Sequence, residues 1–115
     1  MQDVLLRQAV AGDLNNLVEL ENQCFIDDRI SRRSFRRFLE VPRDRLIVAE
    51  LGSDLVGYCL VLMTAATRLA RIYSIAVSPN VRGKGVGEQL IKAAEKEASD
   101  ADRIVMRLEV REDNA

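Results

Sequence analysis

Residues 72–87 constrain the fold of this 115-residue chain more than any other segment, because an apolar run passes there into a basic, glycine-rich turn. The run is rich in β-branched residues, which favour a strand, and it breaks at Ser78-Pro79-Asn80. After the turn, apolar residues recur at every fourth position, as on the buried face of a helix: Val86, Leu90, Ala94 and Ala98. The segment therefore predicts a strand, a tight glycine turn and the start of a helix, in that order.

The predicted turn has the properties of a phosphate-binding site. A helix that starts directly after such a turn directs several backbone N–H groups outward, together with the positive end of the helix dipole. Gly83, Gly85 and Gly87 allow a ligand to approach the backbone without obstruction by a Cβ atom, and Arg82 and Lys84 add two cations. We therefore expect the turn to bind a phosphate compound. The alternative is a plain glycine-rich turn with incidental basic residues.

The spacing of the glycines separates this turn from two common nucleotide-binding motifs. The Rossmann fingerprint G-x-G-x-x-G and the Walker loop G-x-x-x-x-G-K-[ST] are both absent. Arg82-x-x-Gly85-x-Gly87, after Ile75-Ala76-Val77-Ser78-Pro79, instead resembles the acetyl-CoA signature of the GNAT superfamily of N-acetyltransferases. The resemblance implies that the loop amides bind the pyrophosphate of CoA and that the strand end bonds the pantetheine. The cofactor-binding residues that it implies are Ile75, Ala76, Val77, Arg82, Gly83, Lys84, Gly85, Val86 and Gly87.

A second motif lies near the end of the chain. Residues 103–114 alternate apolar and polar side chains, as a half-buried strand does. Leu108-Glu109-Val110-Arg111 followed by Asn114 resembles the ribosomal-protein alanine N-acetyltransferases within the GNAT superfamily. This resemblance implies that Glu109 is the general base and that Asn114 contacts the cofactor. From the residues alone, a strand glutamate that faces solvent is the favoured interpretation of Glu109.

Composition and length favour one soluble globular domain. A net charge of −1 gives no general attraction for nucleic acid or for an anionic membrane. Neither a signal peptide nor an apolar run of membrane-spanning length is present, so we expect a cytoplasmic protein. Cys24 and Cys59 lie far apart and the chain has no histidine, which predicts two reduced, buried thiols and no metal site.

The hydrophobic pattern predicts the order β-α-α-β-β-β-α-β, an α/β fold with a mixed central sheet flanked by helices. We expect Asp13 to cap the first helix and Ser31 to cap the second. The family continues with another helix, which carries its usual acid tyrosine, and with two more strands. The expectation is therefore a single, truncated N-acetyltransferase domain over residues 1–115. Its sheet edge would pair with a second copy, as a homodimer, or with a downstream segment.

The sequence is less specific about where the acceptor amine would bind. The resemblance implies that the second helix and the loop before it border the acceptor groove. Asp27 and Asp28 of that loop could meet a cationic N-terminus, although Ile26 stands where ribosomal acetyltransferases carry an aromatic residue. Tyr73 could line the acceptor cleft, and the alternative is a core or cross-strand aromatic.

The second helix also carries a basic run: Arg29, Arg32, Arg33, Arg36 and Arg37. One interpretation is a recognition face for an acidic peptide or a nucleic acid. The other, which we prefer, is a solvated face balanced by Asp27, Asp28 and Glu40.

Together these features predict an acetyl-CoA-dependent N-acetyltransferase. Its acceptor would be a primary amine, either a protein N-terminal α-amine or the amine of a small molecule. An α-amine has a pKa of about 8 and a lysine amine about 10.4, so the α-amine loses its proton more readily at neutral pH. Backbone N–H groups of Ile75 or Val77 are candidates to polarise the thioester carbonyl. The alternative function is an acyl-CoA-binding or regulatory module without turnover.

Overall fold

A five-stranded mixed sheet forms the centre of the computed structural model, which describes residues 4–41, 43–63 and 66–106. The strands are β1 (Leu5–Gln8), β2 (Arg45–Leu51), β3 (Asp54–Met63), β4 (Leu69–Val77) and β5 (Ile104–Met106), in that spatial order. The first four strands pair antiparallel, and β5 pairs parallel to the start of β4. The element order and the mixed sheet predicted from the sequence are confirmed.

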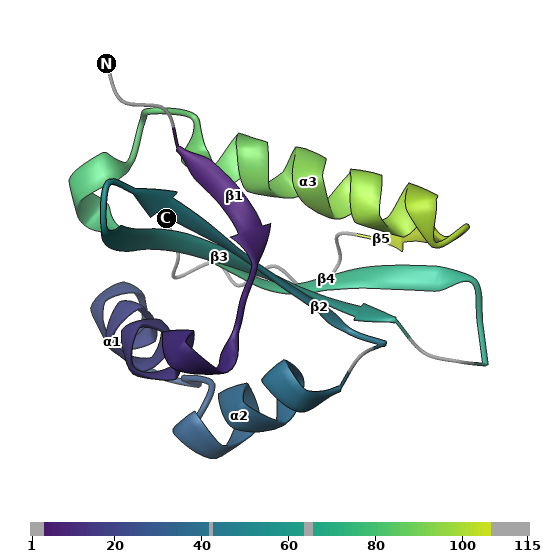
Figure 1. Cartoon of the computed structure of the whole chain (residues 1–115), viewed down its shortest axis with the longest axis horizontal. Helices are drawn as coiled ribbons and strands as arrows, with labels where there is room; N and C mark the ends of the chain where they lie inside the picture. Colours follow the sequence, from purple (N-terminus) through teal and green to yellow (C-terminus); the bar gives the residue numbers. More distant parts are fainter. Residues whose placement is uncertain (1–3, 42, 64–65, 107–115) are drawn as a thin grey trace.

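Helices cover both faces of this sheet (Figure 1). Helices α1 (Leu14–Cys24) and α2 (Arg32–Glu40) lie on one face, and α3 (Val86–Asp100) lies on the other. Two 3₁₀ turns, η1 (Ala11–Asp13) and η2 (Pro79–Val81), precede α1 and α3. Ser31 caps α2 as predicted, because its Oγ accepts a hydrogen bond from the Ser34 N–H at 3.1 Å.

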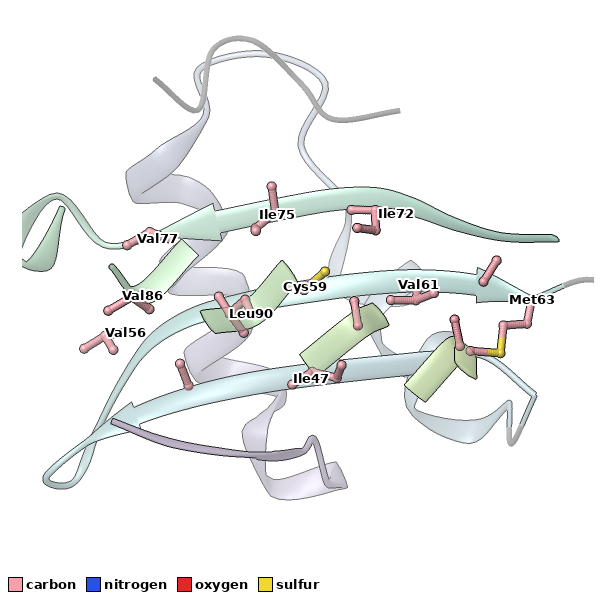
Figure 2. Close-up of a cluster of buried hydrophobic side chains, with 14 of the residues drawn as sticks. Ile47, Val56, Cys59, Val61, Met63, Ile72, Ile75, Val77, Val86 and Leu90 are labelled. Atoms are coloured by element: carbon pink, nitrogen blue, oxygen red, sulfur yellow. The ribbon is translucent and has the colours of Figure 1, made fainter. Parts of the chain in front are cut away.

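The core between α3 and the sheet is the larger of two apolar clusters (Figure 2). All four residues predicted for the buried face of α3 are buried: Val86, Leu90, Ala94 and Ala98. Near the start of α3 the helix is very close to β3, and Gly57 makes this possible. A Cβ atom on Gly57 would lie 3.0 Å from Leu90 Cδ1 and 3.2 Å from the Ala76 carbonyl oxygen. The position of the helix therefore depends on a residue without a side chain on β3.

The second core lies between the sheet and helices α1 and α2. Phe35 of α2 and Tyr58 of β3 are fully buried there, with ring centroids 5.6 Å apart and an interplanar angle of 89°. This edge-to-face arrangement is a favoured geometry for aromatic pairs. It fixes α2 against the centre of the sheet.

A bulge interrupts the pairing of β4 with β3. Consecutive residues Leu60 and Val61 of β3 pair with Ser74 and Ile72, so Tyr73 is the extra residue of β4. A bulge changes which face of the sheet the following side chains reach. Tyr73 is 38% exposed, whereas Ile72 and Ser74 on either side of it are fully buried.

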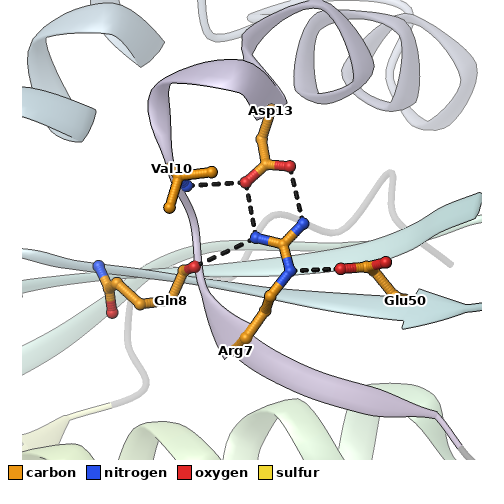
Figure 3. A network of polar contacts seen from close by, with 5 residues as sticks. All are labelled: Arg7, Gln8, Val10, Asp13 and Glu50. Atoms are coloured by element: carbon orange, nitrogen blue, oxygen red, sulfur yellow. Dashed lines mark hydrogen bonds and ion pairs between the residues drawn. The ribbon is translucent and has the colours of Figure 1, made fainter. Parts of the chain in front are cut away.

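Asp13 is the N-cap residue of α1, as predicted, but its side chain makes no capping hydrogen bond to this helix. Its carboxylate accepts hydrogen bonds at 2.8 Å from both Arg7 Nη atoms and at 2.7 Å from the Val10 N–H, which closes η1 instead (Figure 3). Arg7 also donates from Nε to Glu50 on β2. The Arg7 guanidinium lowers the pKa of Asp13, and the two carboxylates raise the pKa of Arg7. The Asp13 carboxylate therefore binds the Arg7 guanidinium of β1 rather than the N–H groups at the start of α1.

Both cysteines are buried and free, as predicted. Burial raises the pKa of the Cys59 thiol to about 12. In the described ranges, no helix has the length and apolarity needed to cross a membrane. Those ranges also contain no group of three or more histidine, cysteine or acidic side chains placed to hold a metal ion.

Candidate cofactor site and acceptor face

The turn between β4 and α3 has a backbone that requires glycine at two positions. Gly83 and Gly85 have φ values of +85° and +81°, in the left-handed region that other residues rarely adopt. Gly85 is the N-cap of α3, and the Gln89 N–H donates to its carbonyl at 3.1 Å. The N–H groups of the first turn precede this bond and have no acceptor within the helix. They point out of the helix end, as an anion-binding turn requires.

These groups border a cavity of about 690 Å³ between the turn, the outer side of α3 and the end of β4. Seven residues predicted to bind the cofactor line it: Ile75, Val77, Arg82, Gly83, Gly85, Val86 and Gly87. Two others do not contribute a side chain, because Ala76 packs in the core with α1 and α2 while Lys84 is exposed beside the cavity. Glu109 and Asn114 lie outside the described residues, and their roles remain predictions.

The wall that α3 contributes to this cavity was not predicted from the sequence. Ile91, Lys92 and Glu95 line it together with Val81 and Glu88. The helical spacing could have predicted them, because Ile91 and Glu95 follow Gly87 by four and eight residues and so lie on the same helix face. Ile91 adds apolar surface, and the charged side chains lie around it. The cavity thus has backbone donors at the glycine turn and, further along α3, one apolar residue among charged side chains.

At the end of β4, one edge of the strand faces away from β3. The Ser78 N–H donates to Val56 O of β3 at 2.8 Å, so the preceding residue directs its backbone groups to the opposite side. Accordingly, the Val77 carbonyl accepts from Cys24 Sγ at 3.3 Å and from Arg82 Nε at 3.2 Å. The N–H groups of Val77 and Ile75 face this same edge by alternation. They are the groups that the sequence analysis proposed for carbonyl polarisation, and they lie at the end of the cavity.

A second cavity, of about 250 Å³, opens on the other face of β4. We call it the acceptor hollow; Tyr73, Asp28, Arg29, Arg37 and Phe38 contribute to its lining. Tyr73 lies two positions before Ile75 in β4, and two positions of a strand span roughly 6.6 Å. Tyr73 lines the acceptor hollow with residues of α2 and so lies on the α2 side of the strand, while the cavity of about 690 Å³ lies on the α3 side.

A buried carboxylate fixes the loop that borders the acceptor hollow. Glu21 of α1 is fully buried, and its two oxygens accept from the Tyr58 hydroxyl at 2.5 Å and from the Ile30 N–H at 2.7 Å. The Tyr58 hydroxyl also lies 2.9 Å from Ser74 Oγ, next to the β4 bulge. The sequence analysis missed Glu21, although its spacing four residues after Leu17 placed it on the buried face of α1.

Residues 14–115 match the profile of the Acetyltransferase (GNAT) family. The chain belongs to this family. The match covers helices α1, α2 and α3 and the two cavities described above, so the geometry above is that of a GNAT domain.

Two similar proteins are bacterial N-acetyltransferases. The chain is 29% identical to a putative [ribosomal protein bS18]-alanine N-acetyltransferase of Bacillus subtilis, over 89% of this chain and 66% of that protein. It is 31% identical to the N-alpha-acetyltransferase RimI of Mycobacterium tuberculosis, over 98% of this chain and 72% of that protein. A thialysine N-epsilon-acetyltransferase of Sus scrofa is 33% identical over 96% of this chain and 76% of that protein. The chain thus spans about two thirds to three quarters of these relatives, whose names give different acceptors.

Solved structures agree on the fold. The ribosomal-protein-S18-alanine N-acetyltransferase of Escherichia coli superposes with a TM-score of 0.76 at 15% identity, over 86% of this chain and 61% of that one. The PaiA N-acetyltransferase of Thermoplasma acidophilum, solved with coenzyme A, gives a TM-score of 0.78 at 15% identity, over 86% and 74%. At this identity the likeness concerns the fold alone, and it confirms the predicted GNAT-like class.

Proposed function

We propose that this chain binds acetyl-CoA in the cavity beside α3 and transfers the acetyl group to a primary amine. The acceptor we propose is a protein N-terminal α-amine, and the proposed location is the cytoplasm. The observation that carries the proposal is the left-handed pair Gly83 and Gly85, which turns the first N–H groups of α3 toward a cavity. Membership of the GNAT acetyltransferase family supports the same function.

The residues present fit the chemistry of CoA. The first turn of α3 offers N–H donors and a positive dipole end to a diphosphate, and Arg82 adds a cation at the cavity wall. Ile75, Val77 and Ile91 give the cavity apolar walls for a thin pantetheine chain. A volume of about 690 Å³ lies within the usual range for cofactor sites, which is about 300–1,000 Å³.

The proposed reaction is an acyl transfer from sulfur to nitrogen. The neutral amine attacks the thioester carbonyl carbon, a C–N bond forms, and the C–S bond breaks with its electron pair going to sulfur. The N–H groups of Ile75 and Val77 would stabilise the negative charge on the carbonyl oxygen. Glu109 would accept the proton of the amine through a water molecule, the CoA sulfur would take up a proton, and Asn114 would contact the cofactor.

The variant Glu109→Gln tests this assignment of the base. We expect turnover to fall by about 10²–10⁴-fold, because general-base assistance typically contributes that much. The affinity for acetyl-CoA should change little, since the amide is nearly the same size as the carboxylate. Thiol release with a peptide acceptor measures turnover, and calorimetry measures the affinity.

Two results would contradict the proposal in different ways. Near-normal turnover of Glu109→Gln would mean that this glutamate does not act as the base. Tight CoA binding with no thiol release from any amine by the unsubstituted chain would favour an acyl-CoA-binding module instead.

A further inference from the structure

The exposed side of α2 carries several positive charges that do not stabilise the fold through ion pairs with other described residues. Arg32, Arg33, Arg36 and Arg37 are exposed, and Arg29 lies just before the helix. In the ranges that the structure describes, none of these five forms an ion pair with a carboxylate. The sequence favoured a solvated face balanced in charge by Asp27, Asp28 and Glu40, and this remains the alternative to a binding surface.

Neutral contacts hold three of these arginines in place. Arg29 Nε donates to Phe25 O at 2.6 Å, and the Arg37 guanidinium lies 5.8 Å from the centre of the Phe38 ring. Arg32 donates to Asn15 Oδ1 at 2.6 Å. Such contacts fix the direction of a guanidinium without neutralising its charge. The surface is therefore positive and partly preorganised.

The arginines line two hollows that adjoin each other. A groove of about 450 Å³, here called the arginine groove, runs beside Arg33, Arg36, Arg37 and Glu40. It shares Arg37 and Ser34 with the acceptor hollow, which reaches Tyr73 on β4. A continuous path therefore leads from the β4 bulge along α2. Its inner end lies beside the strand segment where the proposed acetyl transfer takes place.

We propose that this path binds an acidic peptide whose N-terminal amine is the acetyl acceptor; this inference rests on the proposed function. The acceptor hollow offers two guanidinium groups, of Arg29 and Arg37, to an acidic side chain near the N-terminus of the peptide. Beyond it, the lining of the arginine groove contains three arginines and one acidic residue, so its charge is positive. A small amino acid would fill only the hollow, whereas a peptide with several acidic residues uses both.

The Glu21 carboxylate supports this role for the loop. It holds the Ile30 N–H at 2.7 Å, and the neighbours of that residue, Arg29 and Ser31, both line the acceptor hollow. The hollow is thus tied to the buried core before any ligand arrives. Preorganisation of this kind reduces the entropic cost of binding.

Fluorescence anisotropy with C-terminally labelled peptides tests the inference. The probes are a peptide that begins with aspartate and glutamate residues and a matched peptide with asparagine and glutamine. We expect the acidic peptide to bind at least about tenfold more tightly at low salt, and the difference to shrink as salt screens exposed charges. The double variant Arg33→Gln/Arg36→Gln should raise the Kd of the acidic peptide about 2- to 25-fold, since each exposed pair contributes about 1.4- to 5-fold.

The control is the double variant Arg68→Gln/Lys96→Gln, which removes two exposed cations outside both hollows. It should leave the peptide Kd unchanged. Equal binding of the acidic and amide peptides, or no effect of the arginine variants, would overturn the inference. So would an RNA oligomer that binds in the same groove and displaces the acidic peptide.

Failure of the proposed function gives a different result. Peptide affinity is measured without CoA, and CoA affinity is measured separately by calorimetry. If acidic peptides bind selectively but CoA does not bind, the proposed function fails while the arginine groove stands as a peptide site. If CoA binds and an amide peptide is acetylated as well as the acidic peptide, only the acceptor inference fails.

Discussion

Replacing Gly57 with alanine tests how closely α3 packs against the sheet. The new Cβ atom would lie 3.0 Å from Leu90 Cδ1, 3.2 Å from the Ala76 carbonyl oxygen and 3.3 Å from Val86 Cγ1. The leucine methyl can rotate away, but the carbonyl belongs to the neighbouring strand and cannot move alone. Relief therefore requires β3 to shift against β4 at the Ala76 carbonyl, and the first turn of α3 to shift at Val86, which directly follows Gly85.

The expected loss of stability follows from two opposing effects. Overpacking in a filled core destabilises by about 1–3 kcal/mol. Alanine also lowers the conformational entropy of the unfolded chain, which offsets about 0.4–1 kcal/mol of this loss of stability. We therefore expect the free energy of unfolding of Gly57→Ala to fall by about 0.5–2 kcal/mol. For a domain of this size, that corresponds to a Tm lower by roughly 2–10 °C.

Urea unfolding and thermal melting measure the effect, and Gly12→Ala is the matched control. An alanine Cβ at Gly12 meets no atom within 4 Å and the backbone there has no positive φ, so this variant should be as stable as the original or slightly more. We also expect Gly57→Ala to bind CoA more weakly, because the end of β4 and the start of α3, which would shift, both line the cavity. If Gly57→Ala is as stable as Gly12→Ala, the close packing of α3 on β3 is refuted.

Two polar networks give further predictions. Tyr58→Phe removes a hydrogen bond to the buried Glu21 carboxylate and should lower the free energy of unfolding by about 2–3 kcal/mol in urea; a loss below about 0.5 kcal/mol would contradict this. Asp13→Asn should destabilise by about 2–3 kcal/mol at pH 7, because it removes the carboxylate paired with Arg7. Since folding lowers the pKa of Asp13, this difference should be constant above its unfolded pKa and disappear as the pH falls through its folded pKa. A difference that persisted unchanged in acid unfolding curves would refute the ionic contribution.

Local chemistry made much of the fold predictable. The α3 face follows from a strict apolar repeat that ends at Ala98, and the start of α2 follows from the cap at Ser31. The glycine turn was predictable because few residues other than glycine adopt the left-handed conformation that Gly83 and Gly85 have. These features depend on residues that are close together in the sequence, so the sequence alone is enough to predict them.

What the sequence did not predict depends on partners far along the chain. The extra residue Tyr73 is defined only by its register against β3, and the sequence of β4 contains no sign of it. Asp13 has the spacing of a helix cap, but Arg7 of β1 binds its carboxylate more strongly. The bonds of Glu21 to Tyr58 and Ile30 join three separate segments. In each case a tertiary contact overrides or supplements a local preference.

Calorimetric titration of CoA into the chain, with a negative charge placed at Gly87, tests the central claim most directly. A Cβ atom at Gly87 would meet only Val77 Cγ2, at an ordinary 3.6 Å, so the fold tolerates a side chain there. Glutamate in the first turn also suits the helix dipole, so Gly87→Glu should keep its Tm. The account predicts that the chain binds CoA, that Gly87→Glu binds it at least about tenfold more weakly than Gly87→Gln, and that Gly12→Glu binds it normally. Equal CoA affinity for Gly87→Glu and the unsubstituted chain would contradict a diphosphate site at the start of α3.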